Sequence, residues 1–172
     1  MNLRNGIPIF LYDNDITSIF DAPCGDMNWM QDVIKRVSVR YIGGDIVAKL
    51  IETNSLKYSS EDVKFIEFDI TKDKFPEIDL WMCRAMLYHL SNYDIYLTLK
   101  NFVNSNTKFM LTTNCVTDFH HVNKDIYTGD WRSLNLFLPP FNFPKNPIWE
   151  IDDFTPPHPP MKLLAYTRDQ IA

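Results

Sequence analysis

Cysteine and glycine are scarce in this 172-residue sequence, and long hydrophobic runs are absent. The three cysteines, Cys24, Cys83 and Cys115, are odd in number, and their spacings match no zinc or redox motif. We therefore expect free thiols in a reducing compartment. No apolar run reaches the length of a membrane span, and the N-terminus shows no signal-peptide pattern. These absences predict a soluble, cytoplasmic protein that does not bind membranes.

Positive charge is also in short supply. Lys and Arg number 17 against 22 Asp and Glu, so the formal net charge is -5. Sequence-independent binding of nucleic acid depends on basic side chains that neutralise phosphates, so we expect no nucleic-acid partner. The apolar content of 45% and the length together predict one globular domain over residues 1–172.

The G-x-G-x-x-G pattern of dinucleotide-binding folds is missing as well. A short apolar run over 18–22 leads instead into a turn that holds one glycine, Gly25, between Asp21 and Asp26. A second apolar run ends in another acid, Asp45. A strand, turn, helix, strand and acid in this order are typical of a site for a nucleoside-containing cofactor, whose ribose hydroxyls the second acid binds.

The charges around this turn indicate which cofactor fits. Two carboxylates close to the turn would repel a pyrophosphate. They suit S-adenosylmethionine, which carries a sulfonium and an ammonium group. The alternative is an ordinary α/β turn in which Asp26 caps the following helix.

Strands and helices alternate through the first two thirds of the chain. Apolar runs and alternation predict parallel strands over 18–22, 41–45, 63–69, 78–83 and 108–113, and an antiparallel pair over 148–151 and 162–167. Helical spacing predicts one helix with Met27, Met30, Val33, Ile34 and Val37 on one face and a second marked by Val47, Leu50 and Ile51. A capping box of Ser91 and Asp94 predicts the start of a further helix. Residues 114–147 are rich in proline and aromatic residues and predict a long loop, and the Pro-rich stretch 155–160 joins the final two strands.

In such a sheet the loops that follow parallel strands gather at one edge, where ligands bind. Five loops from separate parts of the chain therefore converge there: 21–26, the residues after Asp45 and Asp69, 84–89, and Asn114 onward. This convergence predicts one crevice that holds both cofactor and acceptor.

The same segments resemble class I S-adenosylmethionine-dependent methyltransferases over roughly residues 16–170. Asp-Ala-Pro-Cys-Gly-Asp at 21–26 is similar to the family's cofactor loop, and Asp45 to its ribose-binding acid. Three pieces, 21–30, 83–91 and 128–144, resemble a bacterial-type subgroup associated with surface polysaccharide and sugar modification.

The resemblance implies a Rossmann-like α/β fold with a mostly parallel seven-stranded sheet, helices on both faces and an antiparallel C-terminal strand pair. It implies S-adenosylmethionine as cofactor and S-adenosylhomocysteine as product. The cofactor-binding residues implied are Asp21, Ala22, Pro23, Cys24, Gly25, Asn28, Trp29, Asp45, Ile46, Asp69, Ile70, Cys83 and Arg84. Arg84 has an alternative role in an ion pair with Asp21 or Asp26.

The chain departs from the family pattern in two ways. Asp26-Met27-Asn28 replaces the second glycine of the cofactor loop, and only residues 1–15 precede the first strand. Many relatives carry helices there that close over the cofactor. The site is therefore open, or a partner subunit in a homo-oligomer or the 114–147 loop closes it.

Methyl transfer to a hydroxyl needs alignment and a base. His89 is the first candidate for the base, because it follows the fourth strand and imidazole titrates near neutral pH. His120 and Asp130 are further catalytic candidates. The alternatives are that His89 packs against the helix turn, and that His120 and His121 are solvated or bind a divalent metal; we expect no metal site.

Asp130, Trp131 and Arg132 are the candidate acceptor-binding residues. Trp131 offers a flat face for a sugar ring, and the two charged side chains can bond hydroxyls or a phosphate. The alternative is a structural turn around Gly129 with Trp131 packed inward.

The sequence thus predicts O-methylation of a sugar or glycan hydroxyl, with a nucleotide-linked sugar among the acceptors. The alternatives are another small molecule, a protein side chain, or a catalytically inactive module that binds cofactor or a partner. No Asn-Pro-Pro-Tyr sequence follows the fourth strand, which argues against amino-group methylation of bases.

Overall fold

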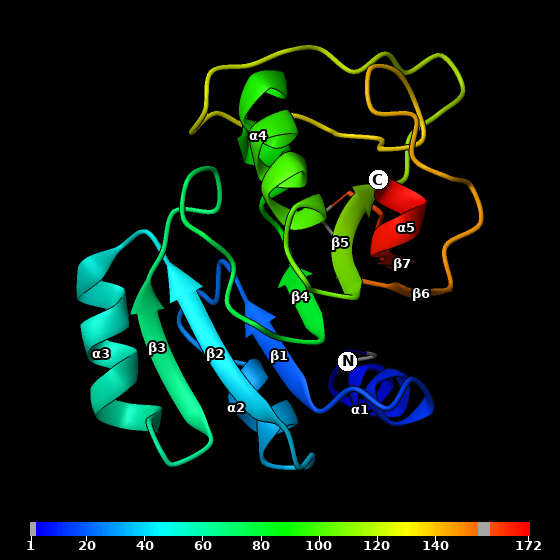
Figure 1. Cartoon of the computed structure of the whole chain (residues 1–172). Coiled ribbons are helices and arrows are strands. Elements are labelled where there is room, and N and C mark those ends of the chain that lie inside the picture. Colours follow the sequence, from blue (N-terminus) through cyan, green and yellow to red (C-terminus); the bar gives the residue numbers. More distant parts are fainter. Residues whose placement is uncertain (1–2, 155–158) are drawn as a thin grey trace.

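The computed structural model describes residues 3–154 and 159–172. Seven strands form one sheet in the order β3-β2-β1-β4-β5-β7-β6 (Figure 1). The strands are β1 (Ser18–Asp21), β2 (Arg40–Asp45), β3 (Val63–Glu67), β4 (Leu80–Cys83), β5 (Phe109–Cys115), β6 (Trp149–Asp152) and β7 (Met161–Thr167). Strands β1 to β5 pair in parallel, and β7 runs antiparallel to both β5 and β6. The mostly parallel sheet with an antiparallel C-terminal pair is therefore confirmed.

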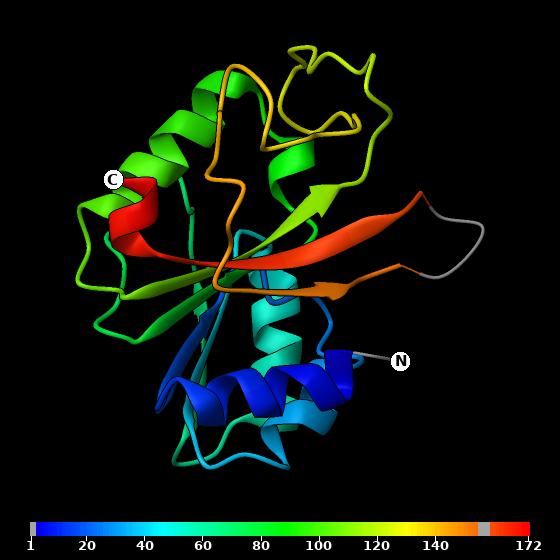
Figure 2. The same ribbon diagram turned by 90° about the vertical axis from the view of Figure 1, so that its right-hand side faces the viewer.

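Helices cover both faces of this sheet, as expected (Figure 2). One face carries α1 (Leu3–Asp13), α2 (Met30–Ile34) and α3 (Ala48–Tyr58); the other carries α4 (Asn92–Val103) and α5 (Arg168–Ile171). Side chains of a strand alternate between the faces. Ile19 and Leu80 consequently pack toward α1 and α2, whereas Phe20 and Trp81 pack toward α4.

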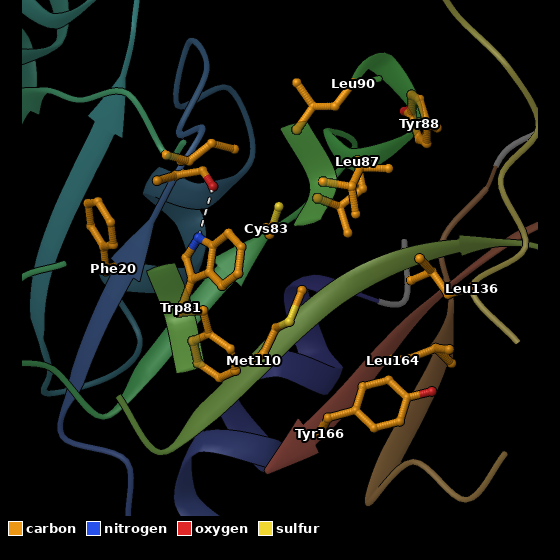
Figure 3. Packing of buried hydrophobic residues seen from close by; sticks show 14 of the residues in the cluster. Phe20, Trp81, Cys83, Leu87, Tyr88, Leu90, Met110, Leu136, Leu164 and Tyr166 are labelled. Atoms are coloured by element: carbon orange, nitrogen blue, oxygen red, sulfur yellow. Dashed lines mark hydrogen bonds between the residues drawn. The ribbon is translucent and has the colours of Figure 1, made fainter. Parts of the chain in front are cut away.

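The core beneath α4 is built around Trp81, which is completely buried (Figure 3). Its indole lies 5.5 Å from the ring of Phe102 on α4 and 5.0 Å from the ring of Phe75. The indole Nε1–H donates a 3.0 Å hydrogen bond to the carbonyl oxygen of Ala22, drawn as a dashed line in Figure 3. Trp81 thus joins the apolar core to the first residue of the loop that follows β1.

Helix α1 forms where the sequence interpretation identified no helix. Its buried residues Leu3, Ile7 and Phe10 recur at helical spacing. Pro8 lies inside the helix and argues against it locally, but packing prevails, since the ring of Phe10 lies 5.1 Å from that of Trp149 on β6. The helix covers a face of the sheet and lines neither cavity of the site described below.

Helix α2 is shorter than predicted and begins at Met30. Met27 has a φ of 61°, in the left-handed region, so the helix cannot extend back to it. The Asp26 carboxylate accepts from the backbone N–H of Asn28 at 3.0 Å and does not cap the helix. That alternative for Asp26 is therefore wrong.

The predicted start of α4 is confirmed, because the Ser91 hydroxyl accepts from the backbone N–H of Asp94 at 3.1 Å. Observed strand ends differ from the predicted ones by one or two residues. Residues 155–158 of the predicted Pro-rich connection lie outside the described residues.

Candidate active site

The loop after β1 is fixed by backbone hydrogen bonds on both sides. Ala22 donates to the carbonyl of Met82 on β4 at 3.0 Å, and Cys24 donates to that of Gly44 on β2 at 2.9 Å. Gly25 then turns the chain with a φ of 57°, which glycine adopts without strain. The loop consequently lies across the carboxyl ends of three neighbouring strands.

Asp45 ends β2 directly beside this loop. One carboxylate oxygen, Oδ1, accepts from the backbone N–H of Val47 at 3.0 Å, and Oδ2 accepts from that of Gly25 at 3.3 Å. The side chain is buried yet contributes to the walls of two cavities. Asp45 therefore stands at their junction, with its orientation set by backbone donors.

The first of these, the apolar cavity, has a volume of about 440 Å³. Its walls come from the ends of β2 and β3, from the 3₁₀ turn η1 (Leu87–His89), from α4 and from the long loop. Apolar side chains dominate them: Ile46, Phe68, Ile70, Met86 and Leu90. Thr128 and Gly129 complete the wall, so part of the 114–147 loop borders this cavity.

The second, the polar cavity, has a volume of about 450 Å³ and shares Pro23 and Asp45 with the first. Charged and polar side chains line it: Asp21, Asp26, Asn28 and Arg84, with Trp29 beside them. An apolar and a charged compartment therefore meet at Asp45.

Asp21 is the buried acid of the polar cavity, with only 3% of its surface exposed. Burial raises the pKa of its carboxyl from 3.8 to about 7. A 2.7 Å hydrogen bond from the Tyr41 hydroxyl and the positive charge of Arg84 oppose this rise in pKa, and the charge of Asp45 adds to it. Asp21 therefore gains or loses a proton near neutral pH.

Arg84 contributes a positive charge to the polar cavity that Asp21 also lines. Its Nε and Nη2 donate to Asp153 Oδ2 and Oδ1 at 2.8 and 2.9 Å, and its guanidinium lies 5.1 Å from the ring centre of Trp29. The predicted alternative partners, Asp21 and Asp26, are therefore replaced by Asp153 in the ion pair. Sequence reasoning missed Asp153, because it lies 69 residues away beyond β6.

Most of the predicted cofactor-binding residues come together at the two cavities. Those that line a cavity are Asp21, Pro23, Cys24, Gly25, Asn28, Trp29, Asp45, Ile46, Asp69, Ile70 and Arg84. Ala22 and Cys83 are fully buried behind the walls. All three cysteines are free and buried, and burial raises the pKa of each thiol.

Asp69 lies on the apolar cavity with its carboxylate already engaged. Its Oδ1 accepts from the backbone N–H and hydroxyl of Thr71 at 2.9 and 2.6 Å, and Oδ2 pairs with Lys72 at 2.8 Å. Burial opposes ionisation, but these bonds together lower the pKa of the Asp69 carboxyl.

His89 lies on the apolar cavity and is tied to the long loop. Its Nδ1 is 2.8 Å from the carbonyl oxygen of Asp130, and its own carbonyl accepts from the N–H of Gly129 at 2.8 Å. Because a carbonyl only accepts, Nδ1 carries the proton in the neutral ring. Nε2 is then left as a hydrogen-bond acceptor.

The other candidates on the long loop do not line either cavity. His120 is exposed and its ring lies 3.7 Å from that of Phe119. Trp131 is half-exposed rather than packed inward, with its ring 6.5 Å from that of Tyr88. Within the described ranges, no group of three or more His, Cys, Asp or Glu side chains is placed to hold a metal ion.

Arg132 is buried, with 6% of its surface exposed. Its guanidinium nitrogens have no hydrogen-bond partner among the described residues, and the closest carboxylate oxygen is that of Asp125 at 3.9 Å. Burial lowers the pKa of Arg132, and the charge of Asp125 partly restores it.

No family model matches the sequence, and no curated protein matches it. Solved structures do match. Human N-acetylserotonin methyltransferase in complex with SAM has a TM-score of 0.62 at 14% identity, over 87% of this chain and 47% of that chain. The 1,6-didemethyltoxoflavin-N1-methyltransferase of Burkholderia thailandensis has a TM-score of 0.70 at 11% identity, and the match covers 95% of this chain and 77% of that chain. Magnesium protoporphyrin IX methyltransferase of Synechocystis has a TM-score of 0.69 at 9% identity, and the match covers 97% of this chain and 82% of that chain.

These matches establish the fold, which is that of S-adenosylmethionine-dependent methyltransferases. The chain spans about half the length of the human enzyme and of a second methyltransferase, SibL, at 47% and 55%. Over the residues described, no helix combines the length and apolar character needed to cross a membrane.

Proposed function

We propose that the protein is an S-adenosylmethionine-dependent methyltransferase. The observation that carries this proposal is the pair of adjoining cavities, one apolar and one charged, with Asp45 between them. S-adenosylmethionine has the same division into an apolar base, a ribose and a charged amino-acid end. The residues fit each part of it.

Ile46, Phe68 and Ile70 offer apolar surfaces to an adenine ring. The Asp45 carboxylate can accept from both ribose hydroxyls, since each oxygen has a second acceptor position beyond its backbone donor. At the charged end, Asp21 suits the ammonium group and Arg84 the carboxylate of the methionine portion.

When bound, S-adenosylmethionine supplies an electrophilic methyl group to an acceptor. The chain's own tasks are to align the acceptor and to accept its proton. Nε2 of His89 is the base we propose, because Nδ1 is committed to the Asp130 carbonyl. That bond also fixes the orientation of the ring.

For the acceptor we propose a sugar or glycan hydroxyl, with nucleotide-linked sugars as the first compounds to test. Trp131, which is 51% exposed, offers a ring face on the long loop, next to the exposed Asp130. The acidic composition argues against a nucleic-acid acceptor. A cytoplasmic location agrees with the three free thiols.

Exposed aromatic side chains favour a second candidate acceptor, a planar small molecule. Phe119, Tyr127 and Trp131 are all exposed on the long loop. The Burkholderia structure contains 1,6-didemethyltoxoflavin and S-adenosylhomocysteine together. A protein side chain as acceptor and an inactive module that binds only cofactor or a partner remain further alternatives.

Calorimetric titration with S-adenosylhomocysteine tests the cofactor assignment. We expect binding by the natural protein and a loss of about 100-fold or more in Asp45→Ala, because two hydrogen bonds to a carboxylate disappear. Glu67→Ala is the matched control, since Glu67 is paired with Asp45 in the β2–β3 register but is exposed. No binding at millimolar S-adenosylhomocysteine would contradict the proposal. If the natural protein binds, a turnover screen with nucleotide-linked sugars tests the acceptor.

A further inference from the structure

Arg132 carries a buried positive charge that has no hydrogen bonds from its side chain to the residues described. Nε, Nη1 and Nη2 of the guanidinium are all buried without an acceptor there, and 6% of the residue is exposed. A guanidinium has several N–H donors, and a buried charge that lacks partners is strongly destabilising. The side chain therefore has donors available for a group that brings negative charge.

The guanidinium faces the N-terminus of α4. Its Nη1 lies 3.9 Å from Oδ1 of Asp125, and that oxygen accepts from the backbone N–H of Asn92, the first residue of α4, at 2.8 Å. The first N–H groups of a helix and its dipole favour an anion in this position. The helix N-terminus and the arginine side chain therefore approach the same carboxylate oxygen.

Asp125 satisfies the helix end but not the arginine. Its Oδ1 also accepts from the backbone N–H of Ile126 at 2.9 Å, whereas 3.9 Å is too long for a hydrogen bond from Arg132. The Asp125 side chain is 62% exposed, so a solute can reach its carboxylate. A larger anion that displaced this carboxylate would meet both the N–H of Asn92 and the unused donors of Arg132.

The same part of the long loop borders the apolar cavity. Gly129, which lines that cavity, donates to the carbonyl of His89 at 2.8 Å, and the backbone N–H of Arg132 donates to the carbonyl of Tyr88 at 3.2 Å. Residues 125–132 are therefore attached to the turn that carries His89, the proposed base. An anion bound at Arg132 would lie next to this turn.

We propose that a phosphate group of the acceptor displaces the Asp125 carboxylate and binds between Arg132 and the N-terminus of α4. A phosphate fits better than a second carboxylate, because its additional oxygens can accept from several guanidinium N–H groups and from Asn92 together. That the phosphate belongs to the acceptor rests on the proposed function. The inference narrows the acceptors to phosphorylated compounds, nucleotide-linked sugars among them.

Thermal unfolding with and without millimolar inorganic phosphate tests the site, with chloride as the reference salt at equal ionic strength. Phosphate should raise the Tm of the natural protein, because it binds the folded state. Arg132→Met should abolish this rise. Without phosphate this variant should melt no lower than the natural protein, since an apolar side chain replaces a buried charge that lacks partners.

Asp125→Asn supplies the opposite change. The asparagine Oδ1 can still accept from Asn92 and Ile126, but the competing charge is gone. Affinity for inorganic phosphate should rise about tenfold or more, because a like charge a few ångströms away no longer opposes the anion. Asp118→Asn is the matched control and should leave this affinity unchanged, since Asp118 is exposed on the same loop and its carboxylate also accepts from a backbone N–H.

A rise in Tm with phosphate that Arg132→Met retains would overturn the inference, and so would a phosphate affinity that Asp125→Asn leaves unchanged. The second variant supplies the test if Arg132→Met does not fold. Calorimetry in the presence of S-adenosylhomocysteine then compares inorganic phosphate with nucleotide-linked sugars. We expect tighter binding of at least one such sugar; inorganic phosphate as the tightest ligand would assign the site to free phosphate and refute the acceptor's part in it.

The two proposals fail separately. A protein that binds S-adenosylhomocysteine but shows no effect of phosphate would contradict this inference and leave the cofactor assignment intact. A protein that binds phosphate through Arg132 but not S-adenosylhomocysteine would keep the anion site and contradict the proposed function.

Discussion

Replacement of Asp21 by asparagine should make the protein more stable and a poorer binder of its cofactor. The amide oxygen of asparagine can still accept from the Tyr41 hydroxyl, which lies 2.7 Å from the carboxylate. The substitution therefore removes a buried ionisable group and little else. Opposite effects on stability and affinity distinguish a functional charge from a structural one.

The size of the expected gain in the free energy of unfolding follows from the pKa of Asp21. In the folded protein burial raises this pKa from 3.8 to about 7. Between these pH values the folded state keeps a proton that the unfolded chain releases, so stability falls as pH rises. At about 1.4 kcal/mol for each tenfold change in proton affinity, the full loss is about 4 kcal/mol by pH 8.

Urea unfolding of both proteins from pH 4 to pH 8 measures this effect. The free energy of unfolding of Asp21→Asn should match that of the natural protein near pH 4. It should exceed it by up to about 4 kcal/mol at pH 8. Asp26→Asn is the control, since Asp26 lies exposed on the same loop and its replacement should give no such trend.

Calorimetry with S-adenosylhomocysteine completes the test. The natural protein should bind more tightly at pH 8 than at pH 6, because the ionised carboxylate faces the ligand's ammonium group. Asp21→Asn should bind weakly at both pH values. A variant less stable than the natural protein at pH 8, or one with unchanged affinity, would refute the reasoning.

Three further substitutions have definite expected outcomes. His89→Gln should reduce turnover at least about 100-fold but change affinity for S-adenosylhomocysteine only a few-fold, in assays of both; a large loss of affinity would place His89 with the cofactor instead. Trp81→Phe should cost about 1–3 kcal/mol in urea unfolding, because the buried carbonyl of Ala22 loses its donor; an unchanged midpoint would contradict this. Gly44→Ala should cost about 1–3 kcal/mol in thermal unfolding, since its Cβ would lie 2.8 Å from the ring of Phe20, and a neutral result would show that the ring moves aside.

The positions of the strands along the chain were predictable because their signals are local. Apolar runs that end in an acid, as at Asp21 and Asp45, mark a strand followed by a loop at the carboxyl edge. The start of α4 was predictable from Ser91, whose capping bond involves residues three apart. Helix α1 was not, because Pro8 opposes it locally and its support comes from Trp149 at the other end of the chain.

The residues predicted to bind cofactor lie together at the two cavities, whereas most of those predicted to bind the acceptor do not line them. Loop residues such as Gly25 and Asn28 lie within one strand–turn–helix unit, so their proximity is set by chain connectivity. Trp131 and Arg132 belong to a loop without regular structure, where spacing carries no information on burial. The structure buries Arg132, although its charge led us to expect contact with the acceptor.

The amino-acid sequence alone determined the α/β class, the parallel strands and the acids at their ends, because periodicity and turn residues act over a few neighbours. Only the tertiary structure decided that Asp153 pairs with Arg84 and that Thr128 reaches Asp94. The partnerships with Asp153 and Thr128 depend on which distant loops the sheet brings to one edge. That selection is made by the packing of the whole chain and by no single segment.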